Sequence, residues 1–139
     1  MLDGKVNIKK LDERAVIPTY GSDLAAGADL YALLEKKLFI KPGETVFIKT
    51  GIALAIPQGY AGFIYARSGL ACKNGLAPAN KVGVVDADYR GEVIVALYNH
   101  SDSVKEVSSG DRIAQLVIEP YYKATFNVVE ELDDTVRAD

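Results

Sequence analysis

Short apolar segments separated by turn signals run along most of the chain. Glycine-containing turn signals recur at Pro42-Gly43, Pro57-Gln58-Gly59, Asn74-Gly75 and Ser109-Gly110-Asp111. The segments between them are rich in β-branched and aromatic residues and cover 5–10, 29–33, 45–49, 52–56, 60–66, 92–98 and 113–118. Many short strands bounded by turns predict an all-β sandwich or barrel.

Two of these segments differ in which faces are apolar. Between Lys5 and Lys10, Val6 and Ile8 alternate with polar residues, which predicts a half-exposed strand. The segment Glu92–Tyr98 is apolar on both faces, and such a strand is covered on both faces. The second cover is either a partner subunit or a loop of the same chain, and the pattern alone favours neither.

One segment does not follow the strand pattern. Ser68–Asn74 has a serine at a plausible N-cap position and Gly75 at a plausible position just beyond a helix end. A two-turn helix and a loop both fit. The predicted fold class is therefore all-β, a sandwich or barrel with at most one short helix.

Length, charge and cysteine content narrow the function classes. A chain of 139 residues predicts one domain, and its net charge of −3 gives no general attraction to nucleic acid or to an anionic membrane. A bound polyanion would therefore have to be held by local arginines and lysines. The single cysteine, Cys72, cannot form an internal disulfide. No signal peptide or membrane-length apolar run is present, so we expect a soluble cytoplasmic protein.

Two short segments carry candidate binding chemistry, a carboxylate in the first and anion donors in the second. Asp29 lies among small residues that allow close approach, although a turn-forming aspartate is the ordinary interpretation. Arg67-Ser68-Gly69 combines a guanidinium, a hydroxyl and the free N–H groups of a possible helix start, which together suit a phosphate. An arginine at a strand end beside an ordinary N-cap serine fits equally well.

Two later segments add charged and polar residues at chain reversals. An apolar run at 82–85 stops at Asp86-Ala87-Asp88-Tyr89-Arg90-Gly91 before a second apolar strand begins, which predicts a β-hairpin with a charged, aromatic bend. A plain hairpin turn needs only Asn-Gly or Asp-Gly, although a solvated charged turn remains an alternative. In Ser108–Tyr121, Arg112 and Gln115 follow the Gly110-Asp111 turn, and alone this segment is interpreted as structural.

Taken together, the four segments resemble a known family. AGADLYA, ARSGLA, GVVDADYRGE and SGDRIAQLVIEP resemble, in order and spacing, the first four motifs of the trimeric dUTP diphosphatases, over about Ala25 to Pro120. The resemblance implies a jelly-roll-like fold and a homotrimer with shared active sites. It also implies Mg²⁺ on the triphosphate and hydrolysis of dUTP to dUMP and pyrophosphate. That reaction limits uracil incorporation into DNA and supplies dUMP for thymidylate synthesis.

The resemblance also implies a role for each motif position. Asp86 would orient and deprotonate the attacking water, and Asp29 would act near the metal through its waters. Tyr89 would pack under the deoxyribose and exclude a 2′-hydroxyl. The phosphate oxygens would be held by Arg67, Ser68 and Gly69, and Gln115 would support the phosphate and water network. The uracil would be read by Asn80, Val84, Val85 and Ile94.

The chain departs from the family at its fifth motif. That motif is a C-terminal arm that begins with arginine, continues Gly-rich with a phenylalanine, and closes over the nucleotide. Here Arg137 matches the start, and the glycines and phenylalanine do not follow before Asp139. We expect residues from about 130 to form a flexible arm that is cut short. If the arm is truly missing, we expect binding with poor turnover.

Two alternatives come from other function classes. The related dCTP deaminases carry a catalytic glutamate five residues beyond the hairpin glycine, but that position is Ala96 here, which cannot transfer a proton. A jelly-roll domain could also be a non-catalytic nucleotide-binding or regulatory module. The presence of Asp86, Tyr89, Arg67 and Ser68 argues for an intact enzyme.

Overall fold

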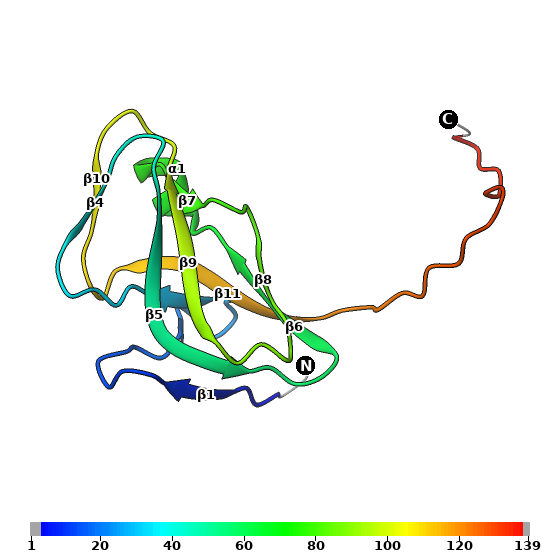
Figure 1. Ribbon diagram of the computed structural model, residues 1–139, viewed down its shortest axis with the longest axis horizontal. Helices are drawn as coiled ribbons and strands as arrows, with labels where there is room; N and C mark the ends of the chain where they lie inside the picture. The colour runs from blue at the N-terminus through cyan, green and yellow to red at the C-terminus, as the bar shows by residue number, and fades with distance from the viewer. Residues whose placement is uncertain (1–3, 138–139) are drawn as a thin grey trace.

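The computed structural model describes residues 4–137 of the chain. Two larger antiparallel sheets, with strand orders β1-β5-β9-β7 and β2-β3-β11-β6-β8, are accompanied by a pair formed by β4 and β10 (Figure 1). The strands are β1 (Asn7–Lys10), β2 (Thr19–Tyr20), β3 (Ala28–Tyr31), β4 (Leu38–Ile40), β5 (Thr45–Ala55), β6 (Tyr60–Tyr65), β7 (Leu76–Pro78), β8 (Gly83–Val85), β9 (Glu92–Asn99), β10 (Lys105–Val107) and β11 (Arg112–Pro120), and the helix is α1 (Ser68–Asn74). The predicted all-β, jelly-roll-like class with one short helix is confirmed.

The core lies between the inward faces of the two larger sheets. Alternate residues of β9, Val93, Val95 and Leu97, are at most 2% exposed, and they belong to the same cluster as Ile113 and Leu116 of β11. Burying each such side chain contributes about 1.5–3 kcal/mol. The other face of β9 is not covered to the same extent within this chain, because Ile94 is 43% exposed.

Several predicted boundaries change in the structure. The segments 45–49 and 52–56 belong to one long strand, β5, because a register irregularity between Lys49 and Ala53 lets the strand continue through Gly51. The helix forms, and Gly75 ends it in the left-handed conformation at φ 73° as predicted. Ser68 is not its N-cap, however. Arg67 occupies that position with extended backbone angles, so Ser68 is the first residue of the helix itself.

The predicted β-hairpin is the main correction. We call Asn80–Val85 the outgoing arm, Asp86–Gly91 the bend, and 92–96 the returning arm. β8 of the outgoing arm pairs with β6, whereas β9 of the returning arm pairs with β5 and β7, so the two arms belong to different sheets. The sequence pattern is compatible with a paired hairpin, but the sheet that each strand joins is decided by distant partners.

The far end of β9 is held by a buried asparagine. Asn99 is fully buried, and its amide donates to the carbonyls of Ile40 and Ser103 at 2.9 and 2.8 Å. Its side-chain oxygen accepts from both the backbone N–H and the hydroxyl of Ser101. Because a buried polar group that loses its partner is costly, these bonds tie β9 to β4 and to the loop after β9.

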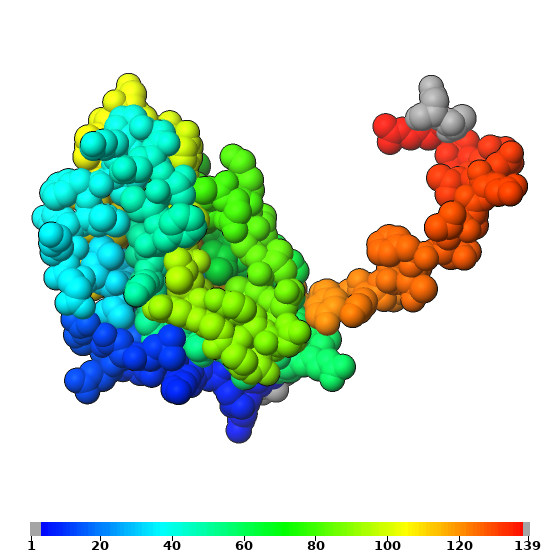
Figure 2. All heavy atoms as spheres, in the orientation of Figure 1, coloured from blue at the N-terminus to red at the C-terminus, as the bar shows by residue number. Residues whose placement is uncertain are grey.

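The chain leaves the body of the molecule after β11. Residues 121–137 contain no strand or helix and are exposed throughout, and Figures 1 and 2 show this segment extending away from the sheets. We call it the C-terminal arm. No helix within 4–137 has the length and apolar character needed to cross a membrane.

Candidate active site

A cluster of polar side chains joins three strand ends, and we call it the arginine cluster. Arg67, which follows β6, donates from Nε to Oδ1 of Asp29 on β3 at 3.0 Å. Nη1 of Arg112, at the start of β11, lies 4.0 Å from the other carboxylate oxygen. Two guanidinium groups thus share one carboxylate whose side chain is only 14% exposed. The cluster carries a local positive excess that attracts an anion.

Gln115 fixes the backbone from which Arg67 projects. It stands on β11 directly across from Asp29 on one side and Tyr65 on the other. Its amide donates to the carbonyl of Ala66 at 2.9 Å. A Cβ at Gly27 would overlap Oε1 of Gln115, so the glycine leaves room for this side chain. The small residues around Asp29 therefore accommodate a neighbouring side chain.

The first turn of α1 adds donors beside the cluster. Ser68 and Gly69 are exposed, and no side chain caps the helix start. The N–H groups of a first helical turn have no partner within the helix. The Arg67 guanidinium, the Ser68 hydroxyl and these N–H groups can therefore converge on one anionic group.

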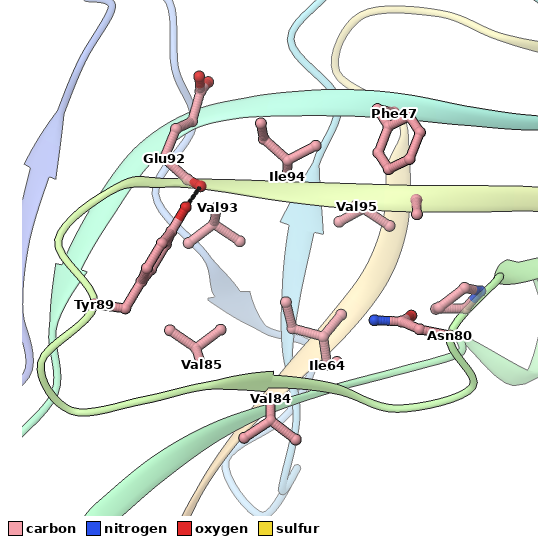
Figure 3. A pocket seen from close by; sticks show the side chains of 13 residues that line it. Phe47, Ile64, Asn80, Val84, Val85, Tyr89, Glu92, Val93, Ile94 and Val95 are labelled. Carbon is pink, nitrogen blue, oxygen red and sulfur yellow. Dashed lines mark hydrogen bonds between the residues drawn. The ribbon is translucent and has the colours of Figure 1, made fainter.

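A pocket of about 340 Å³ opens between the outgoing and returning arms, and we call it the interarm pocket (Figure 3). It exists because the arms join different sheets. The edge of β9 from Glu92 to Val95 that faces away from β5 pairs with no strand in the described part of the chain. The pocket is lined by Phe47, Ile64, Pro78, Asn80, Gly83, Val84, Val85, Tyr89, Glu92, Val93, Ile94, Val95 and Ala96.

Figure 3 shows how individual side chains use this space. Asn80 and Tyr89 lie at opposite ends of the pocket, with Val85 on the outgoing arm between them. The side chain of Val84 points away from the other arm, so this residue offers the pocket mainly its backbone. The arrangement combines an apolar wall, an amide and two strand edges, which suits a flat polar ring.

Tyr89 is held in place at both its backbone and its hydroxyl. Its N–H donates to the carbonyl of Asp86 at 3.1 Å, which closes the turn of the bend. Its hydroxyl donates to the carbonyl of Glu92 at 2.9 Å. A Cβ at Gly91 would stand 2.5 Å from that hydroxyl, so the ring takes the space that the glycine leaves.

Asp86 lies outside the interarm pocket. It is exposed and lines a second hollow of about 950 Å³ with Asp88, Arg90 and Tyr121 at the start of the C-terminal arm. Its neighbour Val85 pairs with Gly62 near the start of β6, while Arg67 follows the end of β6. At about 3.3 Å per residue, the backbones of Asp86 and Arg67 are separated by roughly 15–20 Å within one chain.

The structure thus sorts the sequence-predicted residues into separate groups. Asp29, Arg67 and Gln115 meet in the arginine cluster, with Ser68 and Gly69 beside it. A second group, Asn80, Val84, Val85, Tyr89 and Ile94, surrounds the interarm pocket. Asp86 stands on the bend, and Arg137 is exposed in the C-terminal arm.

Besides Arg112 of the arginine cluster, sequence reasoning assigned no role to four residues that shape these groups. Gly27 and Gly91 accommodate side chains, and Phe47 and Glu92 line the interarm pocket. A glycine inside a charged motif was an available signal for Gly91. Phe47 and Glu92 gave no comparable signal, because only the pairing of β5 with β9 brings them together.

Comparison with known proteins identifies the family to which the chain is related. The model of the dUTPase family matches residues 13–139. The deoxyuridine 5′-triphosphate nucleotidohydrolase of Syntrophotalea carbinolica is 49% identical over 132 residues, covering 95% of this chain and 90% of that protein. The enzyme of the same name from Nautilia profundicola is 47% identical over 133 residues, covering 96% and 92%.

The chain belongs to the dUTPase family.

Solved dUTPase structures share the fold. The Staphylococcus bacteriophage 80alpha dUTPase with dUpNHpp superposes with a TM-score of 0.87 at 26% identity, covering 96% of this chain and 94% of that one. A mutant dUTPase from phage phi11 of S. aureus, described with a structural Mg(II) ion, gives a TM-score of 0.80 at 27% identity, covering 92% and 98%.

The arginine cluster sets limits on how this dUTPase-family chain could hold a metal. Among residues 4–137, no three His, Cys, Asp or Glu side chains gather as a metal site. Asp29 offers one carboxylate, which already accepts from Arg67. Mg²⁺ commonly takes one or two carboxylates and completes its shell with waters and phosphate oxygens. The donor set fits an ion brought by a phosphate ligand and contacted by Asp29 through water.

The steric role of Gly91 can be tested by Gly91→Ala. An ordinary contact needs about 3.4 Å, and the built Cβ stands at 2.5 Å, so the Tyr89 hydroxyl must move by 3.4 − 2.5 = 0.9 Å. We expect a crystal structure of the variant to show the Tyr89–Glu92 hydrogen bond lost. Gly21→Ala is the control, because a Cβ there meets nothing within 4 Å. An unmoved Tyr89 in the Gly91 variant would contradict the role assigned to this glycine.

Proposed function

We propose that this chain hydrolyses dUTP to dUMP and pyrophosphate. The observation that carries the proposal is the interarm pocket with Tyr89 fixed at its bend end, in a chain that belongs to the dUTPase family. In a cell this reaction limits uracil incorporation into DNA and supplies dUMP for thymidylate synthesis.

The base would be read between the two arms. Main-chain groups along the free edge of the returning arm, around Ile94, can bond to the uracil from one side. Backbone groups of Val84 and Val85 and the amide of Asn80 face the same space from the outgoing arm. A base held tightly against fixed backbone would leave no room for a thymine methyl group, and a base whose donors and acceptors do not match would be penalised.

The sugar would pack against Tyr89. The bond to the Glu92 carbonyl and the contact with Gly91 fix the ring, so it cannot swing aside to admit a larger substituent. A ribose 2′-hydroxyl would meet the ring and lose its water without gaining a partner. This selects the deoxyribonucleotide.

The triphosphate would extend to an arginine cluster. Arg67, aligned by Asp29 and by the Gln115-supported backbone, offers a guanidinium fork. Ser68 and Gly69 donate from the first turn of α1, and Gln115 supports this network. A bound Mg²⁺ would neutralise phosphate charge and align the oxygens, with Asp29 contacting it through water. Arg112 adds a second positive charge that the sequence motifs alone did not assign.

Asp86 would hold the attacking water. It is an exposed carboxylate at the bend, next to the residues that bind the nucleoside. A carboxylate within hydrogen-bond reach of a water can orient it and accept its proton during attack on the α-phosphate. The bond between the α-phosphorus and the bridging oxygen then breaks, and pyrophosphate leaves.

We further propose that active sites are shared in a cytoplasmic homotrimer. Within one chain, Asp86 and Arg67 sit beyond opposite ends of β6 and cannot act on the same phosphate. If the interarm pocket of one subunit faced the arginine cluster of another, Asp86 of the first chain and Arg67 of the second could act on the same nucleotide. The half-exposed face of β9 and the C-terminal arm, which leads away from the body, are surfaces that such an assembly can cover. Arg137 on the arm would then reach the phosphates of a neighbouring site.

Deamination of dCTP is disfavoured by the pocket itself. Ala96 lines the interarm pocket at the place where the sequence comparison with deaminases requires a glutamate. Its methyl group can neither accept nor donate a proton. A non-catalytic module is disfavoured because the arginine cluster is fully assembled.

The substrate assignment is tested by pyrophosphate release from dUTP, UTP, dTTP and dCTP, each with and without Mg²⁺. We expect kcat/KM for dUTP to exceed that for the other nucleotides by roughly a hundredfold or more, since pocket sterics and unpaired polar groups both act against them. Activity should fall when Mg²⁺ is chelated. Equal cleavage of UTP and dUTP would refute the sugar assignment, and ammonia release from dCTP would refute the reaction class.

The role of Asp86 is tested by Asp86→Asn. The amide keeps the shape of the side chain but cannot accept the proton, so kcat should fall by about a hundredfold or more while the affinity for dUTP is retained. Asp88→Asn is the matched control, because Asp88 is an aspartate of the same bend that also lines the second hollow. Turnover by Asp86→Asn at the wild-type rate would show that another group handles the water.

Site sharing is tested by co-expressing two inactive variants with different tags. Trimers that contain both Asp86→Asn and Arg67→Ala chains should regain activity at about one site in three, which is roughly a quarter of all sites for random one-to-one assembly, because some sites draw each wild-type residue from a different chain. The control pairs Asp86→Asn with Tyr89→Ala. Both residues lie on one bend, so no site can have both intact. Recovery in neither mixture would place the whole site in one chain.

A further inference from the structure

The β5 irregularity lies directly beside the returning arm. Lys49 pairs with Ile94 and Ala53 pairs with Glu92, so four steps along β5 match two steps along β9. Two extra residues bulge from β5 at this point. Gly51 adopts φ +74° there, and a Cβ on it would stand 2.6 Å from Leu33 and 2.8 Å from Ala15. Packing around Gly51 thus determines where the bulge sits.

Two side chains tie the returning arm to this bulge. The carboxylate of Glu92 accepts from the backbone N–H of Gly51 at 2.9 Å, in a partly buried setting. The hydroxyl of Thr50, which is 1% exposed, donates to the carbonyl of Val93 at 2.5 Å. Bonds to an ionised acceptor or made in the interior resist displacement more than solvated neutral ones. The start of the returning arm is therefore anchored from the side opposite the pocket.

The same residue holds Tyr89 from the pocket side. The carbonyl of Glu92 accepts the Tyr89 hydroxyl at 2.9 Å. Figure 3 shows the Glu92 carboxylate directed away from the pocket while its carbonyl meets the tyrosine. A continuous chain of contacts thus runs from the Gly51 bulge through Glu92 to the Tyr89 ring. Loss of the carboxylate would free the residue that carries the tyrosine's acceptor.

We infer that Glu92 is a positioning residue that, through the β5 bulge, sets where the Tyr89 ring stands and so sets discrimination between deoxyribo- and ribonucleotides. The inference rests on the proposed function, in which Tyr89 packs against the sugar. Glu92 needs no contact of its carboxylate with the nucleotide. Small displacements of a positioned group, of about 1 Å, change such discrimination strongly.

The test compares Glu92→Ala with Glu92→Gln. The alanine variant loses the acceptor for Gly51, and we expect its dUTP-to-UTP ratio of kcat/KM to fall by roughly tenfold. The change should come mainly through a raised KM for dUTP, since Asp86 and the arginine cluster are untouched. The glutamine variant keeps a side-chain oxygen that can accept from the same N–H, so its ratio should stay within about threefold of the wild type.

Glu44→Ala is the matched control. The Glu44 carboxylate also accepts a backbone N–H, that of Lys41 at 3.0 Å, but in the turn before β5 and outside the interarm pocket. We expect a lower melting temperature for it with an unchanged dUTP-to-UTP ratio. A ratio that fell equally in the Glu44 variant would reduce the Glu92 effect to general destabilisation and overturn the inference.

Tyr89→Phe keeps the inference testable if Glu92→Ala does not fold. It removes only the hydroxyl that bonds to Glu92, and its ratio should fall in the same direction. An unchanged dUTP-to-UTP ratio in Tyr89→Phe, or in a folded Glu92→Ala, overturns the inference. A ratio that falls as far in Glu92→Gln as in Glu92→Ala also overturns it.

Failure of the proposed function has a separate readout. The wild-type protein is measured first, for pyrophosphate release and for calorimetric binding of dUMP and UMP. A wild type that neither cleaves dUTP nor prefers dUMP overturns both the proposed function and this inference. A wild type that binds dUMP selectively, combined with an unaltered preference in Glu92→Ala, overturns the inference about Glu92 alone.

Discussion

The placement of β8 and β9 in different sheets is the constraint on which the site depends. Only the bend, residues 86–91, separates these strands, and consecutive antiparallel strands so close in sequence ordinarily pair with each other. Here β8 is committed to β6, while β9 is committed to β5 and β7. The arms therefore separate, and a pocket of about 340 Å³ takes the place of a hydrogen-bonded ladder. Free strand edges elsewhere invite pairing with another chain, but these face each other across a ligand-sized space.

The local charge around Asp29 is opposite in sign to the net charge of the chain. The net charge is −3, yet at the ends of β3, β6 and β11 two arginines face the single carboxylate of Asp29. That carboxylate holds the Arg67 guanidinium in place without cancelling both positive charges. Gln115 contributes a neutral support that does not compete for an anion. An acidic protein can thus present an anion site, because electrostatic attraction at a few ångströms depends on nearby groups more than on distant ones.

Two glycines and one bulge restrict the positions of side chains in the candidate site. Gly27 and Gly91 are places where a neighbouring side chain occupies the space of a missing Cβ, Gln115 in one case and Tyr89 in the other. The bulge at Gly51 anchors Glu92 from behind. The two glycines restrict a neighbouring side chain through close contact, and the bulge holds Glu92 through a hydrogen bond. This kind of positioning uses interior packing, which tolerates little displacement.

The sequence by itself determined the class of the fold and the identity of most candidate site residues. Alternation, turn glycines such as Gly75, and the four motifs are local features, and local features follow from short-range sterics and residue chemistry. Tertiary structure decided where the elements begin and end and which strands pair with one another. It merged two predicted strands into β5, made Arg67 rather than Ser68 the helix N-cap, and sent the two arms to separate sheets. It also brought Glu92 to Gly51, residues 41 apart. Sheet partners and bulge contacts lie far apart in the chain, so their choice depends on the packing of the whole core, which no short stretch of sequence encodes.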